Sequence, residues 1–272
     1  MEWPQYLILF LVAAVGGAVN SVAGGGTLLT FPALLWVGKL TEVMANATST
    51  VALWPGQLGS LWGYRNQLGP SHAAVALLAV PSFVGGWIGA ALLLKTGNET
   101  FRALVPYLIL GATLLFTAQE PLARWQRRRA EREASEPNAG GGSGPGGGDA
   151  AWSAFRWAVV ILFQLLVAVY GGYFGAGIGI LMLAALGFVG FTNIHRMNAI
   201  KNINGMCINV VAAVMFIVNG LVDWRLASLM AAGAVLGGYA GAGTAQRLGQ
   251  KNVRRIVVLV GFALTISLLV RG

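Results

Sequence analysis

Ala23-Gly24-Gly25-Gly26-Thr27-Leu28-Leu29 interrupts a long apolar run with glycine, and Ala176-Gly177-Ile178-Gly179-Ile180-Leu181-Met182 does the same later in the chain. Gly24 and Gly177 are 153 positions apart, as are Gly26 and Gly179. Inside a bilayer, a glycine-interrupted backbone is tolerated only where it is buried in protein or lines a watery cavity. We therefore interpret the rest of the chain around these two stretches.

The composition is that of a polytopic membrane protein. Of the 272 residues, 56% are hydrophobic and 10% are charged, whereas a soluble domain has about 25% charged residues. The net charge of +9 comes from cations that flank apolar spans, so no nucleic-acid partner is expected. A single cysteine and two distant histidines give no metal cluster, and no nucleophile–base pair lies in the spans. We expect neither a cofactor nor an enzymatic activity.

Uncharged windows locate the membrane segments. The windows 3–38 and 157–194 would be about 54–57 Å long as single helices, well beyond the ~30 Å hydrocarbon core. Each must turn back, and the glycine stretches near 22–26 and 173–179 are where it can. This predicts ten membrane segments, five in each half, and the alternative is one full span plus a re-entrant loop in each half. The remaining windows are 43–64, 66–94, 103–119, 202–222, 226–246 and 256–270.

The two halves repeat each other beyond the glycine stretches. One register, with a single one-residue slip, covers most of both halves and predicts an internal duplication. We expect a first membrane repeat at 1–119, a flexible cytoplasmic linker at 120–151 and a second membrane repeat at 152–272. The matched pairs are Met44 with Met197, 85–90 with 237–242, Gly97 with Gly249, and Arg102 with Arg254.

The distribution of cations favours inverted repeats. With the N-terminus outside and the arginine-rich linker inside, 13 of the 18 lysines and arginines lie inside and 5 outside. This bias follows the positive-inside rule. The predicted fold class is an all-α polytopic membrane protein with two inverted repeats of about five segments each and glycine-broken helices. No acidic residue lies mid-span, so a carboxylate proton relay is not expected.

The glycine breaks are candidate anion sites. A helix that restarts after a break begins with unpaired N–H groups and the positive end of its dipole. Alternatively, the glycines only permit close helix packing, which is our interpretation of Gly85-Gly86 and Gly237-Gly238. The candidate residues are Asn20, Gly24, Gly25, Gly26 and Thr27 in the first half, and Tyr173, Gly177 and Gly179 in the second.

The segment after each glycine hairpin is unusually polar for a membrane span. It reads Ala-Asn-Ala-Thr-Ser-Thr at 45–50 and Asn-Ala-Ile-Lys-Asn-Ile-Asn at 198–204. Lys201 either snorkels to the cytoplasmic headgroups or faces a polar cavity, where it would neutralise an anionic substrate. The candidate substrate contacts in these two runs are Asn46, Thr48, Ser49, Asn198, Lys201 and Asn202.

Taken together, these motifs resemble the sulfite exporter TauE/SafE family of membrane transporters. The likeness rests on Ala-Gly-Gly-Gly-Thr at 23–27, Gly-Ala-Gly-Ile-Gly at 175–179, and the runs at 45–50 and 85–90. It covers nearly the whole chain apart from the linker, although Ile178 interrupts the second glycine run. The resemblance implies a carrier of sulfite, sulfonates or related small organic anions.

The expected setting is the cytoplasmic membrane, where the chain would be a multi-pass protein whose partners are the lipid bilayer and a small anion. A passive anion channel of the same architecture is the alternative function. The coupling ion, H⁺ or Na⁺, stays open, and so does a homodimer.

Overall fold

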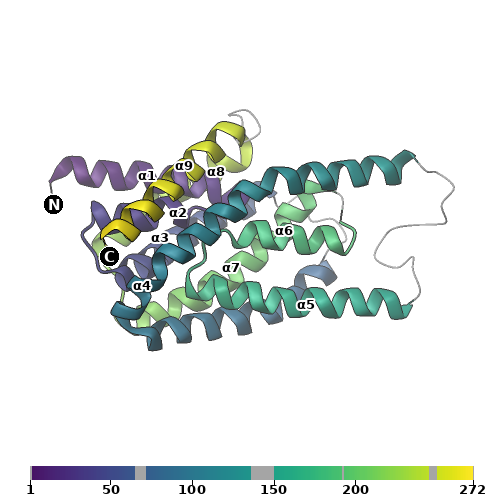
Figure 1. The fold of residues 1–272 in the computed structure, drawn as a ribbon, viewed down its shortest axis with the longest axis horizontal. Coiled ribbons are helices and arrows are strands. Elements are labelled where there is room, and N and C mark those ends of the chain that lie inside the picture. Colours follow the sequence, from purple (N-terminus) through teal and green to yellow (C-terminus); the bar gives the residue numbers. More distant parts are fainter. Residues whose placement is uncertain (1, 65–71, 136–149, 192, 245–249, 272) are drawn as a thin grey trace.

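The computed structural model describes residues 2–64, 72–135, 150–191, 193–244 and 250–271. These residues form an all-helical structure, as the sequence predicts (Figure 1). In chain order the helices are α1 (Trp3–Ala23), α2 (Thr27–Trp36), α3 (Glu42–Tyr64), α4 (His72–Ser135), α5 (Ala150–Tyr173), α6 (Ile178–Phe188), α7 (Ile194–Val218), α8 (Trp224–Thr244) and α9 (Gln250–Arg271).

Several of these helices are long and apolar enough to cross a membrane. Four such stretches lie in the described part of the chain, at Trp3–Ser21, Ala73–Ala118, Ala154–Tyr173 and Arg196–Val218. Shorter apolar helices cover Thr27–Trp36, Ile178–Phe188 and Val258–Leu268. The prediction of a polytopic membrane protein is therefore confirmed.

Helix α4 is broken at Gly97, which divides its long apolar stretch in two. Gly97 has φ 70° and ψ 163°, a conformation that is open to glycine and strained for residues with a side chain. A Cβ atom at Gly97 would meet no heavy atom within 4 Å. The backbone conformation, and not a lack of space, therefore requires glycine here.

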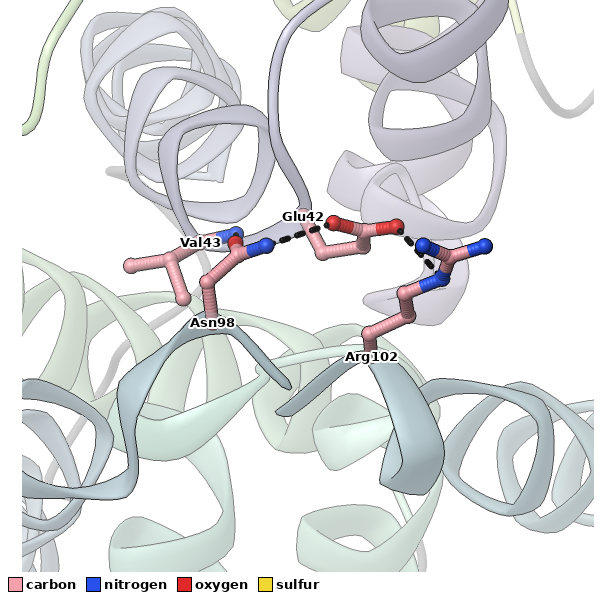
Figure 2. A network of polar contacts seen from close by, with 4 residues as sticks. All are labelled: Glu42, Val43, Asn98 and Arg102. Atoms are coloured by element: carbon pink, nitrogen blue, oxygen red, sulfur yellow. Dashed lines mark hydrogen bonds and ion pairs between the residues drawn. The ribbon is translucent and has the colours of Figure 1, made fainter. Parts of the chain in front are cut away.

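A polar network holds the start of α3 against the second part of α4 (Figure 2). The Asn98 side chain accepts a hydrogen bond from the Val43 N–H at 3.2 Å and donates one to the Glu42 carboxylate at 3.1 Å. The Arg102 Nε atom lies 3.6 Å from the same carboxylate. The network thus fixes the chain on the C-terminal side of the Gly97 break.

Each glycine stretch reverses the chain. Helix α1 ends at Gly24, whose φ of 72° is left-handed, and a Cβ on Gly16 of α1 would lie 3.0 Å from the Thr30 side chain of α2. Helix α2 therefore runs back along α1. In the second half the chain turns through Gly175 and Gly177, whose φ values are 81° and 82°, before α6 begins.

The two ends of the chain lie at the same end of the molecule, and α4 ends and α5 begins at the opposite end (Figure 1). Helix α4 extends into the predicted linker and ends at Ser135. Residues 136–149 lie outside the described part of the chain. The boundaries 1–119, 120–151 and 152–272, and the cytoplasmic side of the linker, stay predictions.

Close packing between small residues interleaves the two halves. Helix α1 packs on α8, where a Cβ at Gly17 or Gly237 would overlap the backbone of Ala234 or Ala14. Helix α5 packs on α4 in the same way, with glycines such as Gly172 against the backbone of the opposing helix. The packing interpretation of Gly85-Gly86 and Gly237-Gly238 is confirmed, because a Cβ at any of these four positions would lie within 3.0 Å of an atom of a neighbouring helix.

Candidate functional site at the helix breaks

The two glycine turns, one from each half, meet each other. The Gly177 N–H donates a hydrogen bond to the Gly24 carbonyl oxygen at 3.2 Å. A Cβ on Gly24 would lie 2.6 Å from the Cα atom of Gly179, closer than real Cβ contacts allow. The breaks therefore form one joint in the interior of the protein.

The Gly24–Gly26 triplet is packed on all sides. A Cβ on Gly25 would overlap the Phe116 ring, and one on Gly26 would overlap the Gly16 carbonyl oxygen. Close packing thus requires these glycines in this conformation. The Gly177 N–H, one of the groups expected to face an anion, is already bonded to Gly24. Anion binding at the glycine turns stays a prediction.

The polar runs at 45–50 on α3 and 198–204 on α7 reach across to the helix ends of the opposite half. From α3, the Asn46 amide donates to the Tyr173 carbonyl oxygen at the end of α5, at 3.0 Å. From α7, Lys201 Nζ and the Asn202 amide donate to the Ser21 carbonyl oxygen near the end of α1, at 3.2 and 3.4 Å. The last carbonyls of a helix carry a partial negative charge, so these donors stabilise both breaks. The two contacts are reciprocal, and each joins one half to the other.

Lys201 is buried. It is only 3% exposed, so its ammonium does not reach the headgroups, and the snorkelling interpretation is wrong for this conformation. Its hydrogen-bond partner, the Ser21 carbonyl, is neutral. Among the described residues the ion pair is Glu42–Arg102, and no carboxylate contacts Lys201. A protonated Lys201 without a counter-charge would be strongly unfavourable here, so an anionic ligand would stabilise the protonated form of this amine.

Other predicted site residues have structural partners. The Ser49 and Thr30 hydroxyls lie 2.6 Å apart, and Thr48 accepts a hydrogen bond from the Asp223 N–H at 3.1 Å. The Tyr173 hydroxyl donates to Thr96, beside the α4 break, at 3.2 Å. These contacts join helices, and they place Thr48 beside the start of α8.

The remaining candidates are Asn20 and Thr27 beside the first glycine turn, and the asparagines of α3 and α7. The Asn20 carbonyl accepts the Gly24 N–H, and Thr27 is buried at the start of α2. Asn46 and Asn198 are buried, and the side-chain oxygen of each lacks a hydrogen-bond partner. A buried acceptor of this kind is a place where a ligand donor can bind. Within the described ranges, no three His, Cys, Asp or Glu side chains gather as metal ligands would.

A second buried polar cluster was missed from the sequence. The Gln164 amide of α5 donates to the Ser82 hydroxyl of α4 at 2.9 Å, and Ser82 lies 3.4 Å from the side-chain oxygen of Asn204 on α7. Gln164, Asn204 and Lys201 line one narrow gap, together with Leu78, Met182, Ala185, Leu186 and Ile200. The available signal was Gln164, an amide in the middle of the otherwise apolar run 157–172.

Apolar helices of membrane-spanning length, two buried helix breaks and a buried lysine are features expected of a polytopic membrane transporter. The chain belongs to the sulfite exporter TauE/SafE family, whose model matches residues 9–268. The resemblance stated from the motifs is thereby confirmed over nearly the whole chain.

Curated relatives carry transporter names. A probable membrane transporter protein of Haemophilus influenzae is 26% identical over 263 residues, which cover 95% of this chain and 92% of the relative. The probable membrane transporter protein YfcA of Escherichia coli is 27% identical over 265 residues, covering 96% and 88%. The probable membrane transporter protein YunE of Bacillus subtilis is 21% identical over 275 residues, covering 94% and 96%. No solved structure matches the chain.

Proposed function

We propose that this protein is a secondary transporter, acting as an exporter in the cytoplasmic membrane, of small anions such as sulfite, sulfonates or related organic anions. The observation that carries this proposal is the buried Lys201 amine, whose described partner is the neutral Ser21 carbonyl. An oxyanion beside Lys201 supplies the missing counter-charge. Asn198 and Asn202 lie on the same face of α7 and add amide groups to the site.

Alternating access between inverted repeats is the proposed mechanism. The reciprocal contacts support it, because Asn46 binds the end of α5 while Lys201 and Asn202 bind the end of α1. Two contacts that each join one half to the helix end of the other can be broken one at a time, which would open the site to one side and then to the other.

A carrier fits this conformation better than a passive channel. The glycine turns are in backbone contact, and the gap beside Lys201 is too narrow to admit a water molecule. A path that is closed at rest needs a conformational change for each transported anion. Proteoliposome flux separates the two functions, because a carrier saturates and shows counterflow of a labelled anion, whereas a channel shows neither.

A thermal-shift screen of the purified protein tests the proposed substrate class. A ligand that binds only the folded state raises the unfolding temperature as its concentration rises. We expect stabilisation by sulfite or a sulfonate, and a smaller effect from chloride at equal ionic strength. If no sulfur oxyanion or carboxylate stabilises the protein, the anion-transporter proposal fails.

A further inference from the structure

Gly205 of α7 borders an open space inside the protein. It lies four residues beyond Lys201, so both positions face the same side of the helix. Gly205 is buried, and yet a Cβ atom there would meet no heavy atom within 4 Å. Most other buried glycines are packed against a neighbouring helix, as Gly86 and Gly172 are. Space at a buried position therefore distinguishes Gly205.

The corresponding place in the first half is filled. The residue equivalent to Gly205 is Ala52 at the repeat offset of 153 residues, or Leu53 at the offset of 152 residues after the slip. Both side chains are buried. The Leu53 side chain lies within 4 Å of the Cβ position at Gly16 of α1. At this position of the repeat the open space is thus found in the second half and not in the first, on the same helix face as Lys201.

Donors for an oxyanion surround this part of α7. An ammonium has three N–H donors, and Lys201 uses one of them on the Ser21 carbonyl. Ser82, Gln164 and Asn204 are buried in the same layer. The Ser82 hydroxyl already donates to the Leu78 carbonyl oxygen, and each amide has one N–H left after its bond to Ser82 or to the Ile200 carbonyl. These polar groups come from α4, α5 and α7, and a ligand bound among them would contact three helices.

Two arginines, one on α5 and one on α7, lie on the route by which an anion could reach this polar cluster. Arg156 lies eight residues before Gln164, and Arg196 lies eight residues before Asn204, so each arginine shares a helix face with its amide. The arginines lie over the rings of Phe188 and Phe191, at 5.7 and 6.0 Å from the ring centroids. An apolar layer that includes Val160, Leu186 and Ile200 separates them from the amides. The positive charges of Arg156 and Arg196, on the outer side of this apolar layer, would raise the local concentration of anions there.

We infer that Lys201 and Gly205 bound the anion chamber of this protein, and that Gly205 sets the size of the substrate. In the conformation that binds the anion, in which the closed gap beside Lys201 has widened, the charged head lies at Lys201 with the Gln164 and Asn204 amides beside it. The part of the substrate that follows the head occupies the space at Gly205. This inference rests on the proposed transport function and adds to it a residue that selects among organic anions.

Substitutions that fill the space test the inference. Gly205→Ala adds one methyl group and Gly205→Leu adds a full side chain. Gly111→Leu is the matched control, because Gly111 is an exposed helical glycine of α4 whose Cβ would also meet nothing within 4 Å. The probes are sulfite, ethanesulfonate and benzenesulfonate, whose dissociation constants are measured with purified full-length protein.

We expect Gly205→Leu to weaken binding of the larger sulfonates at least tenfold and binding of sulfite less, with Gly205→Ala between it and wild type. Gly111→Leu should match wild type for every anion. The unfolding temperature of Gly205→Ala should equal or exceed that of wild type, since a Cβ atom there meets no heavy atom within 4 Å.

The inference is overturned if Gly205→Leu binds all three anions as wild type does while Lys201→Met still loses affinity, and this result leaves the transport function standing. It is also overturned if Gly205→Ala already lowers the unfolding temperature, because the position would then be packed. Absence of binding of every probe to wild type overturns the transport function itself.

Discussion

The Gly177 N–H and the Gly24 carbonyl oxygen, 3.2 Å apart, join the turn of one half to the turn of the other. Neither residue is in helical conformation, since both have positive φ angles. A displacement of one turn therefore displaces the other, unless this hydrogen bond breaks. The joint is where a change in the first half reaches the second.

The glycine triplet provides the first prediction. Gly25→Ala should destabilise the folded protein, because its Cβ would overlap the buried Phe116 ring. Adding Phe116→Leu should restore part of the lost stability by vacating that space. Unfolding temperatures of the two single variants and the double variant measure the coupling between the positions.

Transport by the Gly25→Ala/Phe116→Leu double variant distinguishes a packing role of Gly25 from an anion-binding role. If Gly25 serves packing alone, the double variant regains transport along with stability. A double variant that is stable but inactive would instead indicate that the backbone at Gly25 contacts the anion.

Lys201 provides the second prediction. Lys201→Met keeps the length of the side chain and removes the charge, so anion binding should weaken at least about tenfold, or about 1.4 kcal/mol. The folded protein should be as stable as wild type or more so, because a buried unpaired charge is replaced by an apolar group. Dissociation constants at one salt concentration and unfolding temperatures check both parts.

Lys201→Arg separates charge from shape. Partial retention of affinity would mean that charge dominates, whereas complete loss would mean that the compact ammonium is needed. Equal affinities of wild type and Lys201→Met would remove Lys201 from the site.

The break in α4 provides the third prediction. Gly97→Ala should lower the free energy of unfolding by about 1–3 kcal/mol, since alanine is strained at φ 70° and ψ 163°. Gly111→Ala is the control, because neither position is sterically restricted and Gly111 is helical. This control should be stabilised by up to about 1 kcal/mol, as helical Gly-to-Ala changes are. Equal responses of the two variants would mean that α4 is free to straighten.

Topology provides the fourth prediction. We expect both termini outside and the 120–151 segment in the cytoplasm, because this orientation places most of the cations inside. The two termini lie at one end of the molecule and the junction between α4 and α5 at the other, as an odd number of segments in each half requires (Figure 1). A reporter fused after Gly272 that reads cytoplasmic contradicts the orientation.

The sequence was sufficient for the all-helical, polytopic membrane class of the fold, whereas the inverted repeats stay a prediction. The windows 3–38 and 157–194 are too long for single crossings, and their glycines are where α1 and α5 end in the structure. Length and apolar composition are local properties, and they can therefore be read without knowing which helices pack together.

The contacts of the site could not be predicted in the same way. That Lys201 bonds to Ser21, and Asn46 to Tyr173, depends on how the halves interleave, and no local pattern records this arrangement. The cluster of Ser82, Gln164 and Asn204 was missed for the same reason, since its members come from three helices far apart in sequence. The packing of Gly25 on Phe116 likewise appears only in three dimensions.

The close contact of Gly17 on α1 with Ala234 on α8 also has a consequence for synthesis of the protein. These residues are separated by most of the chain, and at 5–20 residues per second α8 leaves the ribosome roughly 10–40 s after α1. During this interval the glycine face of α1 lies in the membrane without its partner. A nascent chain that stops before α8 would expose this face to other helices or to quality-control proteases, so the last third of the gene decides whether the first helix is stable.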